Sequence, residues 1–134
     1  RTSEVARRVR WQALLKGNAG RIDVALGQQM LADHFDTYTG REQATARTLC
    51  GHCWQDDGSV PGSWGAFLPS GALDGKVTDA ALARRMSFVG RFGIPCGASF
   101  SADAFLAAHP QYEWLRGHLP DLASRPWVEL PGVP

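Results

Sequence analysis

The residues with the clearest chemistry lie together in the middle of the chain, in the motif C-G-H-C at residues 50–53. Two cysteines separated by two residues have the spacing of dithiol redox sites, because this spacing lets the sulfurs meet at the start of a helix. A thioredoxin-like site also needs a buried strand before the motif and a helix after it. Residues 43–48 are polar and residues 54–58 have no helical pattern, so redox catalysis is a minor alternative.

The same part of the sequence also has the residue types that bind zinc, which prefers thiolate and imidazole ligands. The candidate ligands are His34, Cys50, His52, Cys53 and Cys96. A structural zinc site usually has a second pair of closely spaced ligands, and Cys96 stands alone in the sequence. Zinc binding is therefore a second minor alternative. We predict no metal and no cofactor, and interpret the three cysteines as buried thiols with at most one disulfide.

Four further polar residues are candidates for lining or supporting a pocket, namely Asp33, His34, Asp74 and Lys76. A carboxylate can hold an imidazole in one tautomer. Adjacent residues on a helix point about 100° apart, however, so Asp33 and His34 would each need a different partner. Asp74, Lys76 and the nearby Asp79 could line a pocket or form a structural ion-pair network, and the network is the simpler interpretation.

Two amphipathic helices are predicted ahead of the cysteine motif, over residues 4–16 and 24–35. Apolar side chains recur at helical spacing in both, and Asp23 is a good N-cap for the second. We expect Gly27, inside the second helix, to let another backbone approach closely. The two helices should form a hairpin whose apolar faces pack on a sheet.

The second half of the chain predicts strands and short helices. The apolar or aromatic character of residues 63–68 and 86–92 is typical of strands, and helices are expected over residues 79–84 and 102–108. The second strand leads into a G-I-P-C-G turn at residues 93–97, which suggests a backbone held close to another part of the molecule.

Loops are predicted over residues 36–47 and 69–75, a short helix between Pro110 and Pro120, and an extended tail over residues 121–134. Helices come first and strands with short helices follow, which predicts an α+β fold rather than alternating βαβ units. We see no internal boundary, so residues 1–134 form one segment.

Composition excludes several classes of function. With 44% hydrophobic residues the chain can form a core, whereas a net charge of +1 with interspersed signs argues against nucleic-acid binding. The arginine-rich residues 1–10 are expected to be the solvated face of the first helix. No run approaches the roughly 20 apolar residues that span a bilayer, so the chain is not predicted to be transmembrane. We recognise no signal peptide.

Two segments resemble known hydrolase families. Residues 8–53, with R-V-R-W-Q-A-L-L, G-R-I-D-V, M-L-A-D-H and T-L-C-G-H, resemble the C-terminal part of the isopenicillin N acyltransferase-like peptidase family. Residues 71–127, with G-A-L-D-G-K-V-T-D, G-I-P-C-G, F-L-A-A-H-P-Q-Y and R-P-W, resemble the C-terminal end of the phospholipase B-like family. Together the two segments cover most of the chain.

Both families are N-terminal nucleophile hydrolases, so the resemblance implies a four-layer αββα sandwich. In these enzymes a precursor cleaves itself, and the freed N-terminal cysteine attacks an amide or ester with its own α-amino group as base. The acylated substrates could be N-acyl amino compounds or phospholipids. The sequence begins with Arg1 rather than cysteine. The resemblance therefore implies that the nucleophile lies upstream of this sequence.

The hypothesis we favour is the C-terminal segment of such a hydrolase, inactive as this chain alone. Its partner would be the upstream part of its own precursor, covalently joined or as the second chain of a heterodimer. Half of a two-sheet sandwich would expose a large apolar face. A phospholipase B-like role would imply lipid degradation in a secreted, periplasmic or lysosome-like compartment. The further alternative is a noncatalytic interaction module whose helical hairpin docks on a partner.

Overall fold

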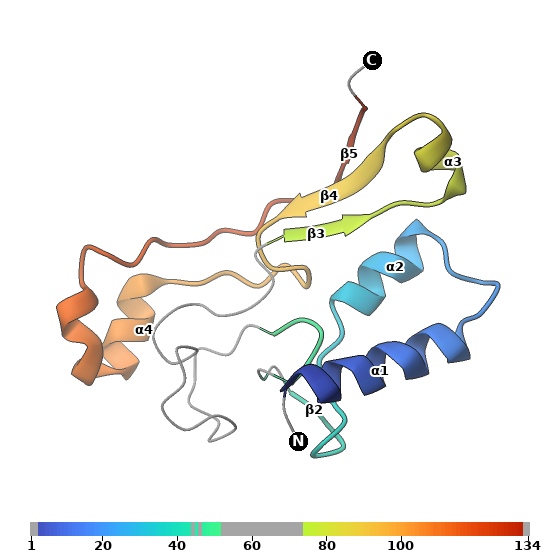
Figure 1. The fold of residues 1–134 in the computed structure, drawn as a ribbon. Helices are drawn as coiled ribbons and strands as arrows, with labels where there is room; N and C mark the ends of the chain where they lie inside the picture. Colours follow the sequence, from blue (N-terminus) through green and yellow to red (C-terminus); the bar gives the residue numbers. More distant parts are fainter. Residues whose placement is uncertain (1–2, 44, 46, 52–73, 133–134) are drawn as a thin grey trace.

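The computed structural model describes residues 3–43, 45, 47–51 and 74–132, and Figure 1 shows their arrangement. Helices, a two-stranded sheet and a three-stranded sheet follow one another along the chain, so the general α+β class is confirmed. Across these ranges no helix is long and apolar enough to cross a membrane. The strand predicted over residues 63–68 lies outside them.

The expected helical hairpin is formed by α1 (Ser3–Gly17) and α2 (Val24–Leu31). α2 packs against strand β3 (Asp74–Val77), where a Cβ atom at Gly27 would lie 2.7 Å from the Cγ1 atom of Val77. Glycine therefore allows this contact, as expected. The group that approaches is a side chain, however, and not the backbone that the sequence led us to predict.

The second helix ends earlier than predicted, since residues 33–35 are not helical. The N–H of Ala32 makes the last helical bond, and the Asp33 carboxylate then accepts a bond from the N–H of Phe35 at 3.1 Å. Aspartate side chains offer the backbone a partner that competes with the helix. The chain therefore leaves the helix at this point, and Asp33 and His34 lie on a connection rather than on one helix.

The predicted loop over residues 36–47 contains a small antiparallel hairpin, β1 (Phe35–Asp36) and β2 (Arg41–Glu42). The carboxylate of Asp36 accepts a hydrogen bond from the N–H of Tyr38 at 2.8 Å, which closes the turn between the strands. Strands of two residues have no recognisable period, which is why the sequence pattern did not reveal them.

The second sheet is antiparallel in the order β3-β4-β5, with β4 (Phe88–Phe92) in the centre and β5 (Val128–Leu130) at one edge. The prediction of a turn over residues 69–75 is wrong at its end, because Asp74 and Gly75 belong to β3. Both are turn-forming residue types, and pairing with β4 overrides this local preference.

α3 (Ala80–Arg84) joins β3 to β4, close to its predicted position. Asp79 caps it, since its side chain accepts a hydrogen bond from the N–H of Leu82 at 2.7 Å. The structure thus shows Asp79 as a helix cap, a role that neither of the two predicted alternatives included.

The two faces of this sheet differ, because paired residues project from the same face. Val77 and Val89 are paired and lie on the face that α2 covers, and the Trp127 ring packs on Gly75 from the same face. Phe92 and Val128 lie on the opposite face, which carries no helix among the described residues.

The C-terminal lobe (residues 100–122) is built around α4 (Ala102–Ala108) and the 3-10 helix η2 (Pro110–Leu115). As predicted, a helix begins after Ser101, whose hydroxyl accepts the N–H of Ala104. The lobe has an aromatic core of its own. Figure 1 shows this lobe at the left of the molecule, apart from α1 and α2.

Candidate thiol–imidazole site

Three side chains with metal-binding or nucleophilic chemistry converge from the connection after α2, from the segment around residue 50 and from the turn after β4. One ligand atom each from His34, Cys50 and Cys96 lies within 4.8 Å of the other two. Cys50 is fully buried, whereas His34 and Cys96 are half-buried. Both thiols are free. The sequence analysis named all three among its candidate zinc ligands, but it treated zinc binding as a minor alternative because Cys96 stands alone in the sequence.

Backbone hydrogen bonds fix the first two residues of this cluster relative to each other. The N–H of Cys50 donates to the carbonyl of Asp33 at 3.0 Å, directly before His34. The N–H of Gln43, just after β2, donates to the carbonyl of His34 at 2.9 Å. Hydrogen bonds from the Cys50 segment and from the end of the β1–β2 hairpin therefore fix the backbone at Asp33 and His34.

Cys96 lies in the predicted turn that follows β4. The N–H of Gly97 donates to the carbonyl of Ile94 at 2.8 Å, and Gly97 has a φ of +91°, which favours glycine. The hydroxyl of Ser124 accepts the N–H of Ile94 at 2.9 Å. A Cβ at Gly93, where φ is +106°, would lie 2.6 Å from the Cα of Ser124. This confirms the expected close approach and identifies Ser124 as the neighbour.

Burial raises the pKa of the Cys50 thiol to about 12. The nearby Cys96 and the Asp33 carboxylate disfavour a thiolate further, while the backbone N–H of Cys96 donates to the sulfur and partly offsets these effects. Because the thiolate is the nucleophilic form, Cys50 is a neutral and unreactive thiol at neutral pH when no cation is bound.

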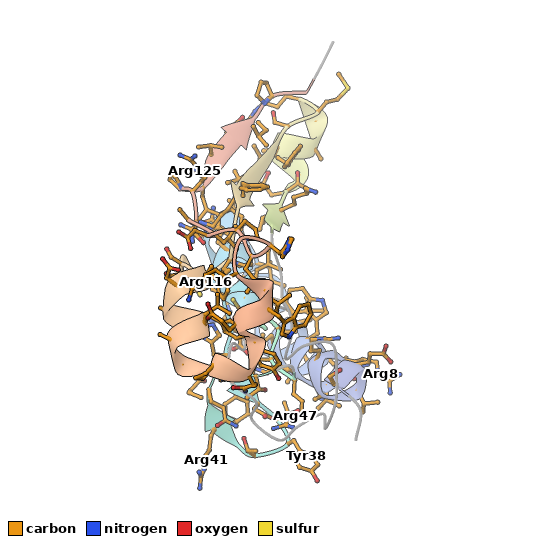
Figure 2. All side chains as sticks on the ribbon, turned by 90° about the vertical axis from the view of Figure 1, so that its left-hand side faces the viewer. Arg8, Tyr38, Arg41, Arg47, Arg116 and Arg125 are labelled. Atoms are coloured by element: carbon orange, nitrogen blue, oxygen red, sulfur yellow. The ribbon has the colours of Figure 1, made fainter. Side chains whose placement is uncertain are left out.

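Asp33 pairs with Arg10 of α1. Nε and Nη2 of Arg10 donate to the two carboxylate oxygens at 2.9 and 2.5 Å, and the guanidinium lies 4.5 Å from the centroid of the Phe35 ring. The hydrogen bond that Arg10 donates to the Asp33 carboxylate raises the pKa of Arg10 above its ordinary value. Arg10 thus corrects the prediction of a purely solvated arginine face, whereas Arg8 projects outward in Figure 2 as predicted.

A second polar cluster, which the sequence analysis missed, surrounds the fully buried Asp36. Its carboxylate accepts hydrogen bonds from Nε of Arg47 at 2.8 Å, from the Thr45 hydroxyl at 3.3 Å and from the N–H of Tyr38. Burial alone would raise the pKa of Asp36, but the bonds from Tyr38 and Arg47 outweigh it and hold this pKa below its usual value. Figure 2 shows Arg47 beside Tyr38, whose ring lies 5.3 Å from the guanidinium.

The other predicted site residues lie elsewhere. Lys76 is an exposed residue of β3 and lines a hollow of about 480 Å³ on the sheet, to which neither Asp33 nor His34 contributes. Asp74 lies at the start of β3, and its side chain is outside the described part. His52 and Cys53 are also outside it. Of the four predicted pocket residues, Lys76 thus lines a hollow apart from Asp33 and His34.

Comparisons of this chain with family models, with curated proteins and with solved structures find no match.

Proposed function

We propose that this chain is the C-terminal segment of an N-terminal nucleophile hydrolase that cleaves an amide or ester bond of an acylated substrate. In this proposal the nucleophile lies outside the sequence, and β3-β4-β5 is part of one sheet of a four-layer αββα sandwich. The sequence resemblance motivates the proposal, and the observation that carries it is the uncovered apolar face of this sheet.

Much of this face is apolar, although the exposed Lys76 also lies on it. Its exposed apolar residues are Phe92 at 67%, Val128 at 48% and Leu130 at 41%, and they surround the hollow that Phe88 also lines. In a four-layer sandwich each sheet carries helices on one face and packs its other face on the second sheet, about 10 Å away. α2 on one face and apolar side chains on the other fit one half of such an arrangement.

The properties of Cys50 support a nucleophile located elsewhere. A nucleophilic cysteine needs a lowered pKa or an adjacent base, and partial exposure to its substrate. Cys50 has the opposite properties, since it is fully buried and its pKa is raised to about 12. In this proposal His34 and Asp33 support the chain segments around Cys50 and do not take part in catalysis. Lys76 lies at the edge of the apolar face.

The first test is processing of the protein made from the complete gene. Intact mass and N-terminal sequencing should reveal a polypeptide that begins with cysteine and copurifies with this segment. The purified protein should then hydrolyse acylated amines or phospholipids, and replacing that cysteine with alanine should abolish turnover. An unprocessed protein that hydrolyses neither substrate class would refute the hydrolase. If that protein instead bound a partner through its helical hairpin, the noncatalytic interaction module would replace the hydrolase as the proposed function.

The second test addresses the uncovered face directly, with a control matched in exposure. Phe92 is 67% exposed on this face, and Trp114 is 66% exposed on η2. A charge at Phe92 would be buried against the second sheet, so Phe92→Glu should prevent assembly and activity, whereas Trp114→Glu should leave both unchanged. Equal assembly and activity of the two variants would contradict the proposed packing.

A further inference from the structure

We propose that His34, Cys50 and Cys96 together bind one zinc ion. This inference reverses the metal prediction made from the sequence, and it does not rest on the proposed hydrolase function. Two thiolates and one imidazole from three separate segments are a ligand set that zinc prefers over harder cations such as Mg²⁺ or Ca²⁺.

The distances suit such a site. A tetrahedral zinc with Zn–S of about 2.3 Å and Zn–N of about 2.0 Å places its ligand atoms roughly 3.5–3.8 Å apart. The three ligand atoms lie within 4.8 Å of one another. Side-chain rotations that move atoms by about 1 Å therefore complete the geometry. Three protein ligands leave the fourth tetrahedral position to water or to another donor.

The surroundings of the sulfurs are also those of metal-bound cysteines. Hydrogen bonds to the ligand atoms orient and tune them, and the backbone N–H of Cys96 donates to the sulfur of Cys50. Cys96 lies in a hydrogen-bonded turn closed by Gly97, and the N–H of Cys50 is held by the carbonyl of Asp33. The frame of the site is therefore fixed by backbone contacts and does not depend on the ion.

The charge balance favours the same ion. Binding of Zn²⁺ releases one proton from each thiol, so two thiolates, a neutral imidazole and the ion sum to zero. The nearby Asp33 carboxylate is already compensated by Arg10. A neutral cluster can be buried at Cys50 without an unpaired charge.

The direct test is a cobalt titration of the full-length protein, purified under reducing conditions and stripped with a chelator. One equivalent of Co²⁺ should produce a sulfur-to-cobalt charge-transfer band in the near ultraviolet and intense visible bands typical of tetrahedral sites. Zn²⁺ should then displace the cobalt and remove the bands. Absence of the charge-transfer band in the fully reduced protein would overturn the proposal, whatever disulfide forms on oxidation.

Variants assign the ligands. Cys96→Ser and His34→Gln should each weaken zinc binding by about 100-fold or more, because losing a direct ligand costs at least as much as losing an outer partner. His118→Gln is the matched control, since His118 is exposed and distant from the cluster in sequence. Circular dichroism of each reduced, metal-free variant checks that it folds. A folded Cys96→Ser protein with wild-type affinity and an unchanged charge-transfer band would refute the assignment.

Discussion

Two regions of the molecule have buried centres of opposite chemistry. One is the polar cluster of residues 33–50, called the junction below, and the other is the C-terminal lobe around Phe105. At the junction the buried residues are Asp36, Thr45, Thr48 and Cys50, tied together by hydrogen bonds. In the lobe they are aromatic and aliphatic, and Phe105 stacks on Tyr112 with ring centroids 5.9 Å apart. Hydrogen bonds between buried polar groups thus stabilise one region, and packing of apolar side chains stabilises the other.

The two regions differ in how much change they tolerate. Apolar packing is non-directional and tolerates replacement by residues of similar volume. A buried hydrogen-bond network tolerates little, since each lost partner leaves another polar group unsatisfied. The potential ligands Cys50 and His34 belong to the junction, where backbone hydrogen bonds hold the chain in place. The lobe, in contrast, carries no group of three or more potential metal ligands among its described residues.

The largest effect should come from Asp36→Ala. The substitution leaves the Arg47 guanidinium and the N–H of Tyr38 without their common acceptor, and breaking a buried pair in this way costs about 3–5 kcal/mol. Urea unfolding should show this loss of stability. Asp103→Ala removes an aspartate that is 88% exposed and paired with Arg116. It should leave the unfolding midpoint almost unchanged, and a similar loss in both variants would contradict the special role of the junction.

Phe105→Ala should destabilise the lobe by about 3 kcal/mol, because it removes the centre of the aromatic core. Phe105→Leu should cost less than about 1.5 kcal/mol, since apolar packing accepts a similar volume. Under conditions where Phe105→Ala remains folded, it should keep the wild-type cobalt spectrum. A spectrum lost together with the lobe would show that the two regions are not independent.

Much of the fold was predictable because its signals are local. α1 and α2 have helical periodicity, α2 and α4 have capping residues, and the turn after β4 has its glycines and proline. The hairpin of β1 and β2 and the start of β3 were missed or misassigned, because tertiary pairing rather than local pattern determines them. Asp33 likewise ends α2 through a side-chain bond that a periodicity argument does not contain.

The candidate site was predictable only in its parts. The close spacing of the cysteines drew attention to the pair at residues 50 and 53, whereas among the described residues Cys50 lies beside Cys96, far along the chain. One available signal was that Cys50 and Cys96 are each followed directly by glycine, which permits the tight turns that present sulfur ligands. The pairing of Arg10 with Asp33 had no local signal, since it depends on how α1 packs beside β1.

Arg10→Ala should have an intermediate effect on the junction, with a loss of about 1.5 kcal/mol from two charged hydrogen bonds that are only partly shielded from water. Arg8→Ala is the matched control on the same helix, and its exposed side chain predicts almost no change. Chemical denaturation of both variants measures the difference. Equal stability would restore the interpretation of a solvated arginine face.

The smallest expected effect is the loss of stability at acidic pH that comes from protonation of Asp36. Folding holds the pKa of Asp36 below its ordinary value of 3.8, so the folded state binds this proton less tightly than the unfolded state. The resulting stability is fully present above pH 3.8 and is lost as the pH falls through the lowered pKa of the folded protein. Asp36→Asn cannot titrate here, so its stability should fall less between pH 5 and pH 3 than that of the wild type. Urea midpoints measured across this range give the comparison, and parallel curves would mean that the buried carboxylate contributes nothing pH-dependent to the junction.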